Sequence, residues 1–272
     1  MIYRHHIPGP PLSDFIDCFW YYKGFFPDHS LERVVPDGSI ELLIDLEGPA
    51  KKLYSDETGE RYQEFRRSWI SGQHSRFLVI GAEQNSSMMG IRFRPGGVHP
   101  FLPLPVCELN ELVVETELIW GPLTREILEQ IFESVTVEEK FQILEQTLWT
   151  VSKDKLETDA SCTYALARLR ETNHEIRISE LSKEMGVSQR QLLRYFRQRV
   201  GLSPKALAQV FRFQSVIRRL NNEVHVHWAQ IATDAGYFDQ AHFVKDFQRF
   251  TGLNPSYYLL EKRDYTNFIP IR

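Results

Sequence analysis

Two stretches near the end of the chain decide the fold: Ser188-Gln-Arg-Gln-Leu-Leu-Arg-Tyr-Phe-Arg-Gln-Arg-Val-Gly-Leu-Ser-Pro204 and Asp239-Gln-Ala-His-Phe-Val-Lys-Asp-Phe-Gln-Arg-Phe-Thr-Gly-Leu-Asn-Pro255. At an offset of 51 residues they are identical at the pairs Gln189/Gln240, Phe196/Phe247, Gly201/Gly252, Leu202/Leu253 and Pro204/Pro255. Upstream, at an offset of 50, Leu181 pairs with Ile231 and Gly186 with Gly236. The same unit therefore occurs twice, and its turn is one residue longer the second time.

Each unit predicts a short helix, a glycine turn and a second, capped helix. Ser188 and Asp239 have side-chain oxygens that cap a helix N-terminus, and Gln191 completes a capping box with Ser188. Gly201 and Gly252 stand where a helix ends with a glycine. Short helix, turn and second helix is the helix-turn-helix plan, although many all-helical proteins repeat helix pairs without binding DNA.

The whole region after residue 160 is predicted to be helical. The expected helices span residues 163–172, 179–185, 188–201, 203–220, 227–235 and 239–252, with a seventh opening at 254. The 18 residues of the segment 203–220 make a rod of about 27 Å, close to the rise of about 34 Å in one turn of B-DNA. One chain can then place two recognition helices in successive major grooves.

The outward faces of the two capped helices carry residues suited to base edges. Leu192, Phe196 and Val200 recur every four residues and are assigned to the core. Arginine pairs with guanine, glutamine pairs with adenine, and small apolar side chains contact thymine methyls. The expected DNA contacts are Ser188, Gln189, Arg190, Leu193, Arg194, Arg197, Asp239, Gln240, Ala241, His242, Val244 and Lys245. Further candidates for neutralising phosphates are Lys205, Arg212, Arg218 and Arg249.

Charge is divided unevenly between the two halves of the chain. Residues 160–272 contain 17 Lys and Arg against 10 Asp and Glu, a net charge of +7, whereas residues 1–159 carry −11. A basic end favours a polyanionic partner. The three cysteines are widely spaced, the start has no apolar signal region, and no stretch is apolar enough for a membrane span. We expect a cytoplasmic protein without membrane contact.

The first 100 residues show short strands separated by Gly, Pro and Asp, as in residues 39–46 after Pro36-Asp-Gly. The segment 123–149 predicts a helical hairpin, in which Ile127, Ile131 and Leu148 either form a dimer interface or pack on the strands. We expect a β-rich sensor or dimerisation domain at 1–150, a linker at 151–160 and a DNA-binding domain at 161–272.

These motifs resemble the DNA-binding domain of AraC-type transcription regulators. The resemblance rests on Ile178-Ser-Glu-Leu-Ser-Lys-Glu-Met-Gly-Val-Ser, Ile231-Ala-Thr-Asp-Ala-Gly-Tyr-Phe-Asp-Gln and Gly252-Leu-Asn-Pro-Ser-Tyr-Tyr. It implies an α+β protein of two domains: a β-rich, cupin-like N-terminal barrel with the hairpin, and an all-α domain of seven helices with two helix-turn-helix units. It also implies contact with RNA polymerase. The segments Phe19-Trp and Gly90-Ile-Arg-Phe-Arg-Pro-Gly-Gly-Val resemble an uncharacterised N-terminal domain of such regulators.

The family resemblance implies a small-molecule effector or a homodimer contact at the N-terminal domain. Candidate effector residues on the expected strands are Trp20, Arg33, Glu41, His74, Arg92 and Arg94. Strand alternation places Arg92 and Arg94 on one face, either lining a barrel as an anion site or facing water while Ile91 and Phe93 fill the core. The sequence shows no catalytic, cofactor or metal motif. Two alternatives remain. One is an N-terminal enzyme or metal-binding cupin fused to a DNA-binding domain, and the other is a module whose basic helices bind acidic proteins.

Overall fold

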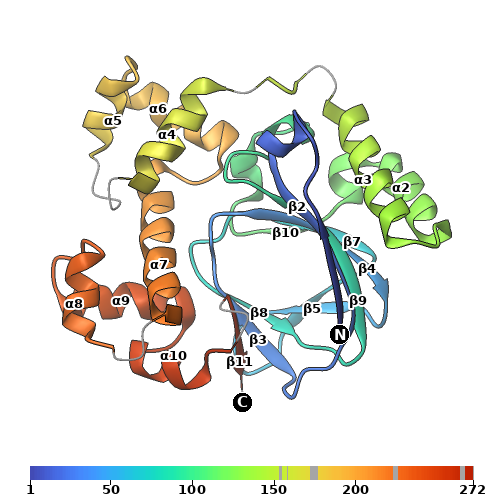
Figure 1. Ribbon diagram of the computed structural model, residues 1–272, viewed down its shortest axis with the longest axis horizontal. Helices are drawn as coiled ribbons and strands as arrows, with labels where there is room; N and C mark the ends of the chain where they lie inside the picture. Colours follow the sequence, from blue (N-terminus) through green and yellow to red (C-terminus); the bar gives the residue numbers. More distant parts are fainter. Residues whose placement is uncertain (153–154, 158, 172–176, 223–225, 264–266, 272) are drawn as a thin grey trace.

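The computed structural model describes residues 1–152, 155–157, 159–171, 177–222, 226–263 and 267–271 (Figure 1). Strands dominate the part before residue 116 and helices the part after it. In Figure 1 the helices α2 and α3 lie on one side of the strands, and α4 to α10 lie on the opposite side. The predicted order of a β-rich part, a helical hairpin and a helical C-terminal part is confirmed.

Within the described residues, the larger sheet has six antiparallel strands. Their order is β1 (Ile2–His6), β2 (Ile16–Phe25), β9 (Ser86–Phe93), β4 (Ile40–Glu47), β7 (Ser68–Ser71) and β10 (Val113–Glu115). Alternation along β9 buries Met89, Ile91 and Phe93 in one cluster, so Arg92 points to the other face. That cluster also holds the buried side chains of the hairpin. Of the two alternatives that the sequence left open, the one in which Ile91 and Phe93 fill the core is borne out for these two residues, whereas Arg92 pairs with Asp37 and Glu41 instead of facing water.

The smaller sheet has five antiparallel strands among the residues that the structure describes, and one of them comes from residues 268–271. Their order is β11 (Phe268–Ile271), β3 (Leu31–Val34), β8 (Leu78–Gly81), β5 (Lys51–Tyr54) and β6 (Tyr62–Phe65). Strand β11 was not predicted, and it pairs Phe268 with Val34 and Ile271 with Leu31. Among the described strands the two sheets share no hydrogen-bonded ladder, so the cupin-like barrel predicted from the sequence is two separate sheets rather than a closed barrel.

The helical hairpin covers the outer face of the larger sheet. A short helix α1 (Glu117–Trp120) leads into α2 (Pro122–Glu133) and α3 (Val137–Ser152). Ile127, Ile131 and Leu148 are buried in the same cluster as Met89 and Ile91. They therefore pack on the strands, which was one of the two alternatives. Short 3₁₀ helices also occur, namely η1 (Leu12–Asp14), η2 (His99–Phe101) and η3 (Val106–Leu109).

In the described part of the chain after the hairpin there are seven helices, as predicted. They are α4 (Ala160–Glu171), α5 (Ile178–Glu184), α6 (Gln189–Arg199), α7 (Pro204–Asn222), α8 (Trp228–Asp234), α9 (Gln240–Thr251) and α10 (Pro255–Glu261). Phe196, Phe213, Phe243 and Phe247 are fully buried in a core that these helices share. Helix α3 continues through Ser152, so the expected linker at 151–160 begins inside a helix.

Candidate nucleic-acid interface and interdomain cleft

Helix α6 begins at a fully formed capping box. The Gln191 N–H donates to Ser188 Oγ at 3.2 Å, and the Ser188 N–H donates to Gln191 Oε1 at 2.9 Å. Leu192 and Phe196 are fully buried, as the spacing predicted. The predicted contact residues on this helix are all exposed, namely Ser188, Gln189, Arg190, Leu193, Arg194 and Arg197. Among the predicted contacts, the helix thus exposes three arginines and one glutamine.

Helix α9 in the second unit exposes fewer of its predicted contact residues than α6 does, and less positive charge. Its cap is Asp239, whose Oδ1 accepts the His242 N–H at 2.7 Å. Gln240, Ala241 and Lys245 are exposed, but Val244 is half-buried against the helical core. The His242 ring lies edge-on to Tyr237, with ring centroids 5.3 Å apart. Lys245 is therefore the cation that this face offers among the predicted contacts.

Two arginines that the sequence suggested for phosphates are held inside the helical domain. Arg212 Nη2 and Arg249 Nη2 each lie 3.3 Å from a carboxylate oxygen of Asp246. The Arg212 guanidinium also covers the Tyr237 ring at 4.2 Å, and Arg212 and Asp246 are both buried. Charge alone could not distinguish these structural arginines from surface ones in the sequence.

The C-terminal ends of both capped helices dock on the N-terminal domain. Asn110 Nδ2 donates to the Gly201 carbonyl at 2.8 Å, and a Cβ at Gly201 would lie 2.9 Å from Asn110 Oδ1. A Cβ at Gly252 would lie 2.9 Å from Cζ of Phe77. Both glycines have positive φ, +98° and +72°, which side-chain-bearing residues rarely adopt. The repeated Gly-Leu-x-Pro motif thus supplies both a helix end and a docking point.

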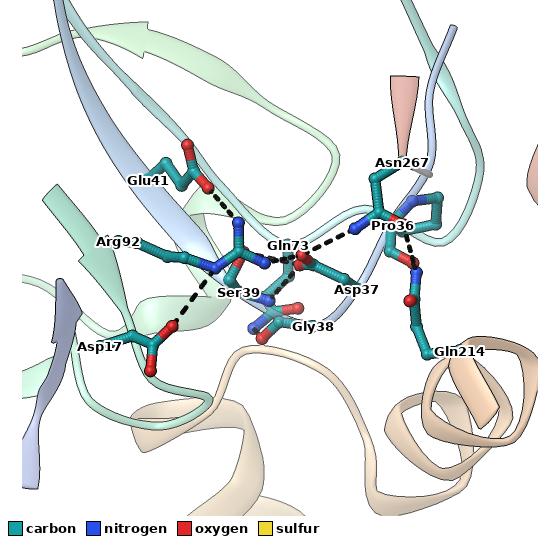
Figure 2. A network of polar contacts seen from close by, with 10 residues as sticks. All are labelled: Asp17, Pro36, Asp37, Gly38, Ser39, Glu41, Gln73, Arg92, Gln214 and Asn267. Atoms are coloured by element: carbon teal, nitrogen blue, oxygen red, sulfur yellow. Dashed lines mark hydrogen bonds and ion pairs between the residues drawn. The ribbon is translucent and has the colours of Figure 1, made fainter. Parts of the chain in front are cut away.

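A polar network joins the two domains between these docking points (Figure 2). Gln214 of α7 donates to the Pro36 carbonyl at 2.9 Å and to Asn267 Oδ1 at 3.0 Å. Asn267 Nδ2 donates to Asp37 Oδ2 at 3.2 Å, and Asp37 is paired with Arg92. Helix α7, which connects the two helix-turn-helix units, is therefore linked by hydrogen bonds to a loop of the N-terminal domain.

Arg92 is the centre of this network. Its Nη1 donates to Glu41 Oε1 at 2.7 Å, and its Nε lies 3.8 Å from Asp17 Oδ2. Burial alone would lower the pKa of Arg92, but the carboxylates of Asp37 and Glu41 outweigh it and raise the pKa. Burial raises the pKa of Glu41 to about 7 despite the opposing charge of Arg92. The guanidinium is thus permanently charged and neutralised within the protein.

A cleft of about 450 Å³ opens beside this network, between the sheets and helices α4 and α7. Its lining residues are Asp17, Asp37, Ser39, Arg92, Phe93, Arg94, Pro95, Arg170, Phe211, Gln214, Arg218 and Asn267. The Arg170 guanidinium covers the Phe211 ring at 4.9 Å. Burial, followed by the like charges of Arg94 and Arg218, lowers the pKa of Arg170.

The structure gathers only part of the effector residues predicted from the sequence. Arg92 and Arg94 line the cleft, and Glu41 contacts Arg92. Trp20 instead stacks on Tyr22 with ring centroids 5.9 Å apart. The two other candidates pair elsewhere: Arg33 Nε donates to Glu57 Oε1 at 3.0 Å, and His74 Nε2 lies 3.1 Å from Ser71 Oγ. The sequence missed Arg170 and Arg218, because they reach the cleft from helices of the other domain.

Among the described residues, no group of three His, Cys, Asp or Glu side chains is arranged to hold a metal ion. No helix in the described ranges is long and apolar enough to cross a bilayer.

Two known protein families match this chain, one in its N-terminal part and one in its C-terminal part. Residues 4–115 match a family described as a domain of unknown function, DUF6597, and residues 181–261 match a family described as a helix-turn-helix domain. The second match covers both predicted units. A protein of Haemophilus influenzae described as an uncharacterized HTH-type transcriptional regulator is 26% identical over 161 residues, which are 59% of this chain. The chain spans about half the length of that curated relative, 51%.

Solved structures with similar chains include ToxT from Vibrio cholerae, at a TM-score of 0.49 and 12% identity, covering 89% of this chain and 98% of that one. Another is a transcriptional regulator with an AraC-type DNA-binding domain from Chromobacterium violaceum, at a TM-score of 0.36 and 20% identity. That likeness covers 39% of this chain and 94% of the other.

Proposed function

We propose that this chain, which carries an AraC-type helix-turn-helix domain, is a transcription regulator that binds duplex DNA through α6 and α9. One observation carries the proposal: both helices leave their capped N-terminal ends exposed while their C-terminal glycines dock on the other domain. The N-terminal residues of a recognition helix are those that contact base edges in the major groove. The domain arrangement therefore leaves the reading ends accessible.

The length of α7 supports binding to two successive major grooves. Its 19 residues make a rod of about 29 Å, close to one turn of B-DNA at about 34 Å. The two recognition helices then lie on one side of the duplex. The proposed site spans about two helical turns of DNA per chain.

The N-terminal domain is proposed to control this binding rather than to catalyse a reaction. Its network reaches α7 through Gln214, so a change at Asp37 or Arg92 is passed to the helix that spaces the two units. We favour control of DNA binding by a small molecule. We also propose that the chain makes a homodimer contact and contacts RNA polymerase. The protein is proposed to act in the cytoplasm.

Fluorescence anisotropy with the full chain tests the proposal. Labelled DNA from upstream of its own coding region is titrated at two salt concentrations, with a mixed-sequence duplex as control. We expect binding that prefers the upstream DNA and weakens steeply with salt, because phosphate neutralisation releases counterions. Equal, salt-insensitive binding or none to either duplex would contradict the proposal.

The alternative is that the basic helices bind an acidic protein. In that case we expect binding to DNA to respond differently to salt and to show no sequence preference. A duplex in which one half of the preferred site is scrambled distinguishes this alternative from sequence-specific DNA binding. Loss of about 1–3 kcal/mol per changed base contact indicates reading of base edges.

A further inference from the structure

The cleft between the domains concentrates positive charge from both of them. Arg94 comes from the end of β9, Arg170 from α4 and Arg218 from α7, and all three are exposed. Arg92 also lines the cleft, but Asp37 and Glu41 neutralise it. Three further arginines thus converge on one cleft from elements that are distant in the sequence.

These three arginines differ in how they are balanced inside the protein. Arg94 Nη1 lies 3.7 Å from Asp17 Oδ1, and its Nε donates to the Ser13 carbonyl at 2.9 Å. Arg170 makes no hydrogen bond or ion pair with any residue in the described part of the chain, and stacks on Phe211 instead. Burial and then the like charges of Arg94 and Arg218 disfavour its charge and lower its pKa, against the smaller opposing effect of Asp17. Like charges held together in this way are stabilised when an anion binds between them.

The size and lining of the cleft define the ligand. A volume of about 450 Å³ lies within the range of about 300–1,000 Å³ that small-molecule sites occupy. Ser39, Gln214 and Asn267 add hydrogen-bonding groups to the arginines, and Phe211 adds one aromatic face. Such a lining suits a polar molecule rather than an apolar chain.

We propose that this cleft binds a small polyanion, a metabolite that carries phosphate or paired carboxylate groups between Arg94 of one domain and Arg170 and Arg218 of the other. Arginine forks bind such oxyanions with two parallel hydrogen bonds. The bound anion bridges the domains beside the Gln214–Pro36 and Asn267–Asp37 contacts and strengthens their docking. That it thereby alters DNA binding rests on the proposed function; the binding site itself does not.

Isothermal titration calorimetry on the full chain tests the site without DNA. The probes are inorganic pyrophosphate and citrate, with acetate at matched ionic strength as the singly charged control. We expect both polyanions to bind at one site per chain and acetate to bind at least tenfold more weakly. Arg170→Gln and Arg94→Gln should each weaken polyanion binding about tenfold or more, because a charge-assisted hydrogen bond contributes about 1.5–3 kcal/mol.

Arg125→Gln is the matched control, because Arg125 is exposed on α2 and pairs with Glu117 at 2.9 Å, outside the cleft. It should bind both polyanions like the unchanged protein. The proposal is overturned if neither polyanion binds, or if all three variants bind equally, since binding would then be distributed over the surface. Circular dichroism of each variant confirms that it is folded.

Anisotropy with DNA, with and without pyrophosphate, tests the coupling separately. We expect a change in DNA affinity that Arg170→Gln abolishes and Arg125→Gln retains, beyond the general effect of salt. If no duplex binds but pyrophosphate does, the proposed function fails and the anion site stands. If DNA binds and neither polyanion does, the site fails and the proposed function stands.

Discussion

Helix α6 of the first helix-turn-helix unit and helix α9 of the second bury equivalent phenylalanines, Phe196 and Phe247, yet they differ on the outside. Helix α6 exposes Arg190, Arg194 and Arg197, whereas α9 exposes Lys245 among its predicted contacts. In α9 the remaining positive charge is directed inward, toward Asp246. The two units thus share their packing residues and differ in the residues on their exposed faces, which are the predicted DNA contacts.

The turns before these helices differ in the same way. In the first unit Val187 is half-buried against the helical core. In the second, Tyr237 is buried at 5% exposure and the additional residue, Phe238, is 93% exposed. An insertion in a turn pushes one side chain outward without altering the helices beside it. The comparison predicts that the first unit dominates DNA affinity through charge and that the second contributes apolar contacts.

The largest expected effect is a loss of folding stability when either of the two equivalent buried phenylalanines is replaced. Phe196→Ala and Phe247→Ala should each lower the free energy of unfolding by about 3–5 kcal/mol, because both create a cavity in a fully buried site. Urea denaturation monitored by circular dichroism measures both. A loss below about 1 kcal/mol in either variant would show that the two interiors are not equivalent.

The second prediction contrasts the outer faces. Arg194→Ala should lower the affinity for the preferred sequence by about 1–3 kcal/mol and relax specificity at one half-site. Lys245→Ala should weaken binding to all sequences and reduce the salt slope by about 1. Anisotropy at several salt concentrations separates these outcomes. Arg194→Lys is the control, because lysine keeps the charge and loses the bidentate geometry; full retention of specificity there would assign Arg194 to a phosphate.

The sequence predicted what depends on local order and missed what depends on distant partners. The caps Ser188 and Asp239, the apolar spacing of α6 and the glycines Gly201 and Gly252 are local signals, and they predicted α6 and α9. Strand β11 was missed because Phe268–Ile271 becomes a strand only by pairing with β3, more than 200 residues earlier. The sequence predicted only part of the cleft lining. Arg92 and Arg94 lie in one expected strand, whereas Arg170 comes from the other domain.

The third prediction concerns the two caps. Ser188→Ala and Asp239→Ala should each lower the free energy of unfolding by about 1 kcal/mol, since each leaves an N–H of the first helical turn without its side-chain acceptor. Thermal and urea denaturation measure the loss. Asp239→Asn keeps the acceptor and should stay within about 0.5 kcal/mol of the unchanged protein. If it is as unstable as Asp239→Ala, the negative charge at the helix N-terminus is the stabilising feature rather than the hydrogen bond.

The smallest expected effect is at Phe238, and it tests whether the longer turn has a role in binding. Phe238→Ser should leave the free energy of unfolding within about 0.5 kcal/mol, because the ring is already in water. It should weaken DNA binding by about 0.5–1 kcal/mol, the value of covering about 20–40 Å² of apolar surface at about 25 cal/mol per Å². Phe238→Leu keeps an apolar side chain and should retain most of the affinity. Unchanged affinity in Phe238→Ser would mean that the extra residue only lengthens the turn, and the difference between the two units would then rest on charge alone.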